Sequence, residues 1–242
     1  MTGQEMAWLF AAGFAAGGIN AAVGSGTLIT FPTLLAMGVP PVIANGTNCL
    51  GLVPGSASGA YAFRDVLDRR VLRWGLIVAA CAMAGALLVL VLPSEVFSAA
   101  VPWLILLAVG LVALQPLLLK HLPEPNPRTS TVALSASGFY GGYFGAGQGI
   151  AFLAALAASG VTAIHDANGF KNVLAGVANL SAAVVFVVGG KVLWSAAAIL
   201  AVSSLLGGWL GGRITRRLPA IALRGLVILV GIVAATVAFL GR

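Results

Sequence analysis

Eight long apolar runs fill most of this chain and leave little polar sequence between them. They span residues 5–37, 42–63, 72–92, 98–119, 129–159, 166–189, 192–212 and 220–241. A run of about 20 apolar residues is long enough to cross the hydrocarbon core of a bilayer as one α-helix. Only 8% of the residues are charged, whereas soluble domains carry about 25%, so the chain cannot cover a water-facing surface. The sequence therefore predicts an all-α polytopic membrane protein.

Two of these runs are too long for one crossing and contain a glycine-rich break. The breaks are GSG at 24–26 and GAGQG at 145–149. About 11 residues follow each break, which is roughly 16 Å of helix, or half of a bilayer core. Non-helical backbone at this depth is tolerated only inside protein or beside a water-filled cavity. We therefore expect each broken run to form a re-entrant hairpin with its tip near the membrane midplane.

The two halves of the chain share short features in the same order. The triplet Ala-Asn-Gly occurs at 44–46 and again 123 residues later at 167–169, and GSG at 24–26 matches GQG at 147–149. This order predicts an internal repeat of the kind found in transporters, although chance similarity between helices rich in glycine and alanine is the alternative. The predicted parts are a first membrane repeat (1–122), a cytoplasmic linker (123–128) and a second membrane repeat (129–242). Each repeat would hold one broken hairpin and three transmembrane helices.

Basic residues gather in three connectors and favour one topology. Ten of the 13 lysines and arginines lie in or next to these connectors: Arg64, Arg69, Arg70, Arg73, Lys120, Arg128, Arg213, Arg216, Arg217 and Arg224. Cytoplasmic loops carry an excess of Lys and Arg, and the connectors share one side only if both broken runs are hairpins. The second repeat is then inverted relative to the first, and both termini lie outside. This distribution also explains the net charge of +7 without nucleic acid as a partner.

Other classes of protein find little support. The N-terminus has no basic segment and carries Glu5, so we do not expect a cleaved signal peptide. Cys49 and Cys81 lie in apolar sequence and predict neither a disulfide framework nor a metal site. The GAGQG segment resembles part of a dinucleotide-binding loop, but no strand–helix unit surrounds it, so we expect no cofactor.

Polar residues near the two breaks form a candidate anion site. A helix begins after each break, and its free N–H groups and positive dipole end attract anions. Asn168, Asn172 and Asn179 share one helical stripe with amide donors, and Lys171 offers a positive charge. The asparagines could instead only join helices, and the lysine could instead snorkel to the surface. The predicted binding residues are Ser25, Gly26, Asn45, Asn48, Gly147, Gln148, Asn168, Lys171, Asn172 and Asn179.

An enzymatic function has the weakest support among the alternatives. Ser-Ala-Ser-Gly at 56–59 and 135–138 resembles the Gly-x-Ser-Gly motif of rhomboid-type intramembrane serine proteases, with serine in place of the first glycine. We expect neither His121 nor His165 to lie within a membrane helix, where a base would be needed. The chain is therefore not expected to be an enzyme.

Three stretches together resemble the sulfite exporter TauE/SafE family over essentially the whole chain. They are GFAAGGINAAVGSGTLITFPTLLAMGVPPVIANGTN in the first half, and GFYGGYFGAGQGIAF and ANGFKNVLAGVANL in the second. The resemblance implies a multi-pass permease of the bacterial cytoplasmic (inner) membrane that transports sulfite, organosulfonates and related anions. Similar proteins often carry a lysine shortly after the Gly-Thr that follows the first Ala-Asn. In this chain that segment is Gly46-Thr47-Asn48-Cys49, with cysteine at the position after Asn48, so Lys171 would act without a symmetric partner.

The alternative to such a secondary transporter is a passive anion channel. The sequence leaves open the anion, the direction of transport, H⁺ or Na⁺ as a coupling ion, and a homodimer.

Overall fold

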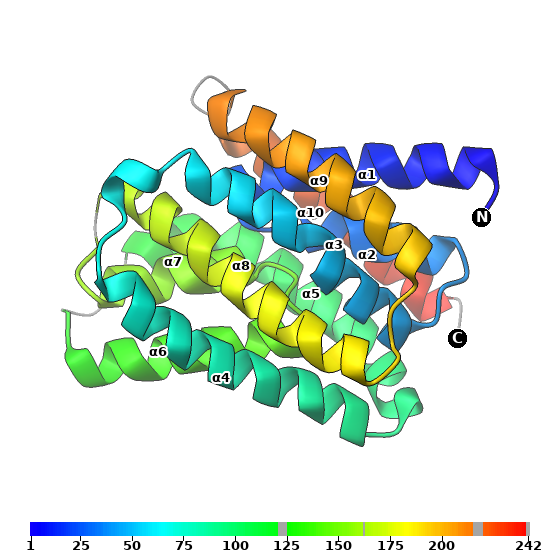
Figure 1. The fold of residues 1–242 in the computed structure, drawn as a ribbon, viewed down its shortest axis with the longest axis horizontal. Helices are drawn as coiled ribbons and strands as arrows, with labels where there is room; N and C mark the ends of the chain where they lie inside the picture. The colour runs from blue at the N-terminus through cyan, green and yellow to red at the C-terminus, as the bar shows by residue number, and fades with distance from the viewer. Residues whose placement is uncertain (121–124, 162, 215–219, 241–242) are drawn as a thin grey trace.

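The computed structural model describes residues 1–120, 125–161, 163–214 and 220–240. These residues are almost entirely helical and contain no β-strand, which confirms the all-α prediction. In chain order (Figure 1) the elements are α1 (Gly3–Ala22), α2 (Thr27–Ala36), α3 (Pro41–Tyr61), a short 3₁₀ helix η1 (Arg64–Val66), α4 (Arg70–Val91), α5 (Ser94–Lys120), α6 (Pro127–Tyr143), α7 (Gln148–Ala158), α8 (Ile164–Val188), α9 (Trp194–Ile214) and α10 (Ala220–Leu240).

Local sequence explains where several helices begin. At the start of α1, the Glu5 N–H donates to Thr2 Oγ1 (3.2 Å) and the Thr2 N–H donates to Glu5 Oε2 (2.7 Å), which is a capping box. At the start of α6, Asn126 Oδ1 accepts from the Arg128 N–H, and Pro127 occupies the first helical position. These caps satisfy backbone donors that have no partner within the helix.

Both glycine-rich segments interrupt a helix, as the sequence predicts. Residues 23–26 separate α1 from α2, and residues 144–147 separate α6 from α7. Gly24 and Gly147 have φ angles of +81° and +72°, a backbone conformation that residues with a Cβ rarely adopt. Glycine at these positions therefore lets the chain turn sharply inside the bundle.

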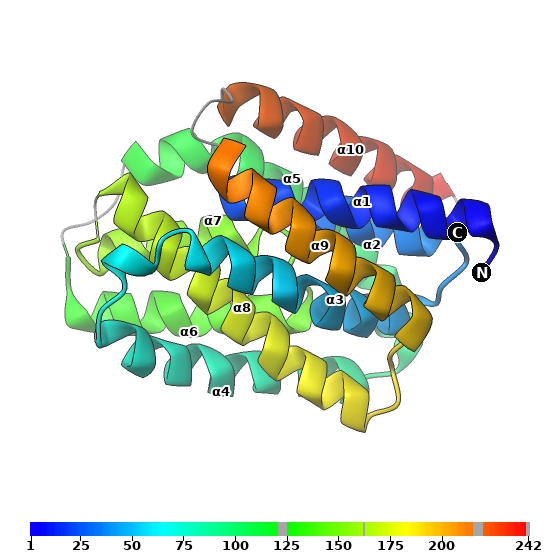
Figure 2. The ribbon, with the colours of Figure 1, turned by 45° about the horizontal axis from the view of Figure 1, so that its top comes forward.

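Each broken segment turns back toward the end from which it came. One cleft is lined by both Trp8 and Met37, which places the start of α1 beside the end of α2. The Ser130 hydroxyl, near the start of α6, donates to the carbonyl of Ala158 at the end of α7 (2.7 Å). Both segments are helical hairpins, and Figures 1 and 2 show that they enter the bundle from opposite ends. Their re-entrant path in the membrane stays a prediction.

The tips of the two hairpins touch in the interior of the bundle. The N–H of Gly149 donates to the carbonyl oxygen of Gly24, with an N···O distance of 3.0 Å. A Cβ added to Gly24 would lie 2.5 Å from the Cα of Gly149, which is too close for any real side chain. The two backbones can meet in this way only because both positions are glycine.

Helices from each half pack mainly against the other half. α4 packs against α6 and α8, while α9 packs against α1 and α3. α3 also packs against α8, and α5 packs against α10 (Figure 2). Each contact has a counterpart if α1–α5 correspond to α6–α10. The repeats at 1–122 and 129–242 stay a prediction; residues 121–124, which include part of the expected linker, lie outside the described residues, and Pro127 already belongs to α6.

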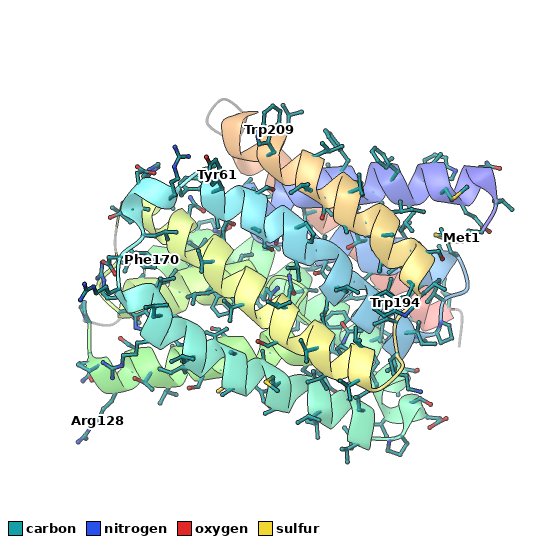
Figure 3. All side chains as sticks on the ribbon, viewed as in Figure 1. Met1, Tyr61, Arg128, Phe170, Trp194 and Trp209 are labelled. Carbon is teal, nitrogen blue, oxygen red and sulfur yellow. The ribbon has the colours of Figure 1, made fainter. Side chains whose placement is uncertain are left out.

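The described basic connectors gather at one end of the bundle, which we call the basic end. A cleft lined by Arg73 and Asn126 brings the start of α4 beside the start of α6. Figure 3 shows Arg128 at this end and Met1 at the opposite one, which we call the terminal end because the start of α1 and the end of α10 lie there. Residues 215–219, in the third connector, lie outside the described residues.

The outer surface of the bundle is apolar. Within the described ranges, four helical segments are long and apolar enough to cross a membrane: Arg70–Val91, Ser94–Leu118, Ile164–Val188 and Trp194–Gly211. Trp8, Trp103 and Trp194 are 63–66% exposed. Large exposed apolar side chains are expected where a protein meets lipid, and tryptophan is enriched at membrane interfaces. The fold is thus that of a multi-pass membrane protein.

We expect the basic end to face the cytoplasm, because cytoplasmic loops are rich in Lys and Arg. In a background without Cys49 and Cys81, single cysteines in place of Asp68 and Arg128 should escape a membrane-impermeant thiol reagent in intact cells. A cysteine in place of Ser195, which contacts Met1 at the terminal end, should react. All three should react after lysis. Labelling at position 68 or 128 in intact cells would contradict this orientation.

We also expect the tip contact to stabilise the bundle. Gly24→Ala and Gly38→Ala both place a Cβ on a residue with positive φ, which costs about 1–2 kcal/mol. Only the first also collides with Gly149, since nothing lies within 4 Å of a Cβ at Gly38. At about 2–4 °C per kcal/mol, Gly38→Ala should lower the melting midpoint of the purified protein by a few degrees. Gly24→Ala should lower it at least about twice as much; equal losses would contradict the role of the contact.

Candidate functional site

Lys171 is the one charged side chain that is fully buried among the described residues. It lies on α8, and its ammonium donates to two carbonyl oxygens at the end of α1: that of Asn20 (3.2 Å) and that of Ala21 (3.0 Å). The lysine does not reach the surface, contrary to the snorkelling alternative. Because the C-terminal end of a helix carries a partial negative charge, a cation is stabilised there.

The charge of Lys171 has no carboxylate beside it. No Asp or Glu is buried in the described part of the chain, whose ion pairs, Arg70–Asp68 and His165–Asp65, involve exposed carboxylates. No group of three His, Cys, Asp or Glu residues that could hold a metal ion occurs there either. Buried charges in proteins are normally paired or bind an ion of opposite charge. An anion next to Lys171 would meet this requirement.

Three polar side chains surround this contact, and with Lys171 they form what we call the lysine cluster: Asn20, Ser56 and Asn172. Asn20 Nδ2 donates to Ser56 Oγ (3.2 Å) and so joins α1 to α3. The amide of Asn172 lies over Gly59, close to the end of α1. Asn172 is fully buried, and neither its amide oxygen nor its nitrogen has a hydrogen-bond partner among the described residues.

At the second break, Gln148 and Asn179 form a buried pair, which we call the glutamine pair. Gln148 Nε2 donates to Asn179 Oδ1 (2.9 Å). Gln148 Oε1 and Asn179 Nδ2 have no partner within the described chain. Gln148 directly precedes Gly149, so the pair lies next to the contact between the hairpin tips.

Asn48 belongs to a third buried group, the threonine cluster, with Thr27 and Thr30. Asn48 Nδ2 donates to Thr27 Oγ1 (3.1 Å), and the Thr30 hydroxyl donates to Asn48 Oδ1. Both ends of the Asn48 amide therefore have partners, and the residue fastens α3 to α2. Its role in binding stays a prediction.

Asn45 and Asn168, which correspond in the two halves, have different surroundings. Asn45 is buried, and its Nδ2 donates to the carbonyl of Tyr143, the last residue of α6 (2.9 Å). It caps the end of α6 much as Lys171 caps the end of α1. Asn168 lies in the first turns of α8 and is half-buried. The Oδ1 atoms of both asparagines have no partner in the described residues.

The remaining predicted residues lie in the breaks themselves. Ser25 is buried, and its hydroxyl has no partner among the described residues. A Cβ on Gly26 would lie 2.5 Å from the carbonyl oxygen of Ala16, and one on Gly147 would lie 3.4 Å from that of Ala108. Close packing against α1 is sufficient to explain Gly26, and the positive φ of +72° is sufficient to explain Gly147, so their role in binding stays a prediction.

The N–H groups that follow each break are partly engaged, although the sequence suggests that they are free. At the start of α2, the N–H of Leu28 donates to the carbonyl of Ser25 (3.2 Å). At the start of α7, the N–H of Gly149 donates to Gly24. In this conformation the open polar atoms near the breaks therefore belong mainly to side chains.

Unpartnered buried atoms are concentrated in the predicted site. Nine buried side-chain nitrogen or oxygen atoms have no hydrogen-bond partner in the described residues. Seven of the nine come from six predicted site residues: Ser25 Oγ, Asn45 Oδ1, Gln148 Oε1, Asn168 Oδ1, Asn172 Oδ1 and Nδ2, and Asn179 Nδ2. Each such group costs about 1–3 kcal/mol of stability. Their concentration indicates a place suited to a polar ligand or ordered water.

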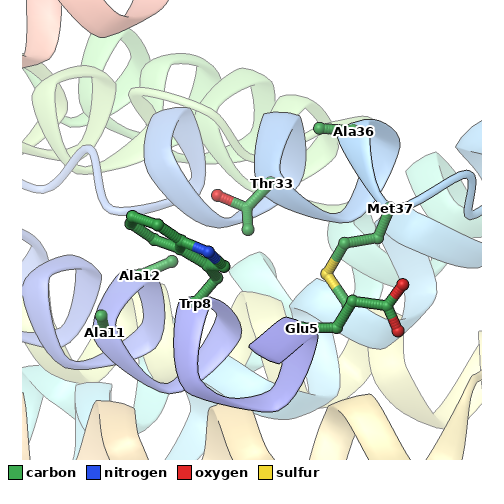
Figure 4. Close-up of a pocket in the computed structure, with 7 residues that line it drawn as sticks. All are labelled: Glu5, Trp8, Ala11, Ala12, Thr33, Ala36 and Met37. Carbon is green, nitrogen blue, oxygen red and sulfur yellow. The ribbon is translucent and has the colours of Figure 1, made fainter. Parts of the chain in front are cut away.

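Two surface clefts lie away from these buried groups. A cleft of about 560 Å³ at the terminal end lies between α1 and α2 and is lined by Glu5, Trp8 and Met37, among others (Figure 4). The cleft at the basic end, lined by Arg73, measures about 320 Å³. Neither is lined by Lys171, whose side chain is fully buried, so a ligand can reach it only if the hairpins or their neighbours move.

The protease alternative gains no support from the geometry. The Ser58 hydroxyl donates to two carbonyl oxygens, the nearer at 2.9 Å. His165 lies in the first turn of α8, at the entrance of the helix, where Nε2 is 3.4 Å from Asp65 Oδ2. His121 lies outside the described residues.

Sequence reasoning missed Asn20, Thr27 and Thr30. Asn20 stands alone in an apolar helix just before the first break, and a polar side chain at membrane depth is itself a signal, because it needs a partner there. Threonine is common in membrane helices, so sequence alone does not mark Thr27 and Thr30 as parts of a polar cluster.

Sequence comparison finds one matching family model and several relatives named as probable membrane transporters. The family model described as "Sulfite exporter TauE/SafE" matches residues 9–238. "Probable membrane transporter protein ORF9" from Sinorhizobium sp. is 32% identical over 233 residues, which cover 94% of this chain and 89% of that protein. "Probable membrane transporter protein" from Haemophilus influenzae is 32% identical over 237 residues, which cover 93% and 90%.

"Probable membrane transporter protein YfcA" from Escherichia coli K12 is 27% identical over 235 residues, which cover 93% of this chain and 86% of that protein. No solved structure matches this chain. With its apolar helices and bacterial relatives, the protein is a multi-pass bacterial membrane protein. The match over nearly all of its length shows that it belongs to the TauE/SafE sulfite exporter family of membrane transporters.

Proposed function

We propose that this chain is a secondary transporter of small anions, of the sulfite or organosulfonate class, and that the anion binds beside Lys171 near the hairpin tips. The observation that carries the proposal is a fully buried ammonium next to the amide of Asn172. In the part of the chain that the structure describes, no carboxylate is buried and this amide has no hydrogen-bond partner. The substrate class is supported by the description of the family.

The lysine cluster offers donors that suit an oxyanion. A lysine ammonium has three donors and no acceptor. Two of them are directed at the carbonyls of Asn20 and Ala21, which leaves one for an oxygen of the anion. Asn172 Nδ2 supplies neutral donors from the same helix. Sulfite and sulfonates present several oxygen acceptors around one sulfur, so they match one charged donor and a few neutral ones.

We also infer that the two halves act as inverted repeats in the transport cycle. In repeat transporters the substrate lies near the midplane, at the repeat interface, beside discontinuous helices. The opposite entry of the two hairpins, their contact at Gly24 and Gly149 and the interlocked helices support this arrangement. Rocking of one hairpin and its neighbours would open the lysine cluster to one side of the membrane at a time.

A passive channel would need a continuous path past the hairpin tips. The hydrogen bond between Gly149 and Gly24 brings the tips into backbone contact, which favours a transporter that changes conformation. Accumulation of labelled sulfite against its own gradient in proteoliposomes would support secondary transport. Flux that only dissipates the sulfite gradient would support a channel.

Removal of the Lys171 charge should weaken anion binding. Lys171→Met keeps the length of the stem, and the apparent affinity for sulfite in proteoliposome uptake should fall tenfold or more. A hydrogen bond to a charged group contributes about 1.5–3 kcal/mol, and about 1.4 kcal/mol corresponds to a tenfold change. Lys171→Arg should retain part of the affinity.

Lys191→Met is the matched control, because it removes an exposed lysine from the α8–α9 connection. It should leave the affinity for sulfite unchanged. The amount of each variant in the membrane is measured in parallel. Unaltered affinity in Lys171→Met would refute the role assigned to the ammonium.

A further inference from the structure

The end of α1 resembles a place where transporters with broken helices hold a metal cation. The last carbonyl oxygens of a helix lack partners within it and carry partial negative charge. In such transporters, helix C-terminal ends and the unwound carbonyls after them coordinate Na⁺ or H⁺. Here the carbonyls of Asn20 and Ala21 accept from the Lys171 ammonium instead. A side chain from the other half of the chain thus takes the position of the cation.

The surroundings of Lys171 leave little reason for a second cation there. A sodium ion on the same carbonyls would lie within roughly 4 Å of the ammonium, and like charges repel strongly in a medium of low dielectric constant. The carboxylates that could offset two positive charges are not buried anywhere in the described chain. The side chains nearby, Asn20, Ser56 and Asn172, are neutral.

We propose that Lys171 is the built-in cation of the first break, and that the anion site therefore works without a bound sodium ion. The proposal rests on the proposed function for the transported anion, but not for the contact between Lys171 and α1. The ammonium neutralises the helix end and supplies the positive charge that faces the anion. Sodium is then not the coupling ion at this site.

The helix end at the second break is capped by a neutral side chain, so a charged cap occurs at the first break alone of the two. The carbonyl of Tyr143, at the end of α6, accepts from the neutral amide of Asn45 (2.9 Å). Tyr143 follows Asn20 by 123 residues, the spacing that also relates the two Ala-Asn-Gly triplets. Equivalent carbonyls are therefore capped from the opposite half in both breaks, by a cation in the first and by an amide in the second.

The first test compares melting midpoints of the purified protein in detergent, followed by tryptophan fluorescence, in NaCl, KCl and choline chloride at equal ionic strength. Wild type and Lys191→Met should each melt at the same temperature in all three salts. Lys171→Met should melt lower in every salt, by on the order of 5 °C, because two buried carbonyls lose a charged donor. If the Lys171→Met protein does not accumulate, the melting midpoints of wild type in the three salts are sufficient to test the proposal.

The second test measures sulfite uptake into proteoliposomes with choline in place of sodium on both sides of the membrane. The initial rate should stay within about twofold of the rate in sodium. A tenfold fall without sodium, or a wild-type midpoint that rises in NaCl but not in choline chloride, would overturn the proposal. So would a Lys171→Met variant that melts like wild type. Absence of uptake in every salt would count only against the proposed function, since the melting comparison needs no substrate.

Discussion

The contact between Gly24 and Gly149 determines where the polar groups of this protein lie. It brings the two helix breaks together inside the bundle, with one hydrogen bond of 3.0 Å between their backbones. One such bond contributes only about 1 kcal/mol, so the importance of the contact lies in its geometry. Because the breaks are buried, the carbonyl ends of α1 and α6 lie away from bulk water, and other parts of the chain supply donors to them.

Those donors come from the opposite half in both cases. Lys171 on α8 caps the end of α1, and Asn45 on α3 caps the end of α6. This exchange is consistent with the packing of the long helices, since α4 and α9 also lie against the other half. A charged residue at the centre of an isolated membrane helix costs about 2.5–3.5 kcal/mol on insertion. Lys171 gains its two acceptors only when α8 packs against the end of α1, so its presence is compatible only with the assembled bundle.

The sequence predicts the course of the chain well, because apolar length and glycine position are local signals. The start of α2 at Thr27 and the return of each broken segment toward the end from which it came follow from helix length and the placement of charge. The partners of the site residues do not follow in the same way. The position of Lys171 along α8 is compatible with snorkelling or with burial. The hydrogen bond from its ammonium to the end of α1, which only the structure shows, distinguishes the two. Likewise, a hydrophobic pattern cannot show which side chains form hydrogen bonds. The amide of Asn48 bonds to two threonines, whereas the side-chain amide of Asn172 has no partner in the described chain.

The same contacts that hold the lysine cluster closed also link it to the hairpins. Any movement that separates α1 from α8 must break the two hydrogen bonds between Lys171 and the carbonyls of α1. The ammonium would then lose both carbonyl acceptors, which is costly unless another acceptor takes their place. An anion that accepts from the same ammonium would offset this cost, while an empty cluster would not. A ligand shifts a conformational equilibrium only by its difference in affinity between the two states. The position of Lys171, shared between a broken helix and a group of unpartnered amides, is one where such a difference can arise.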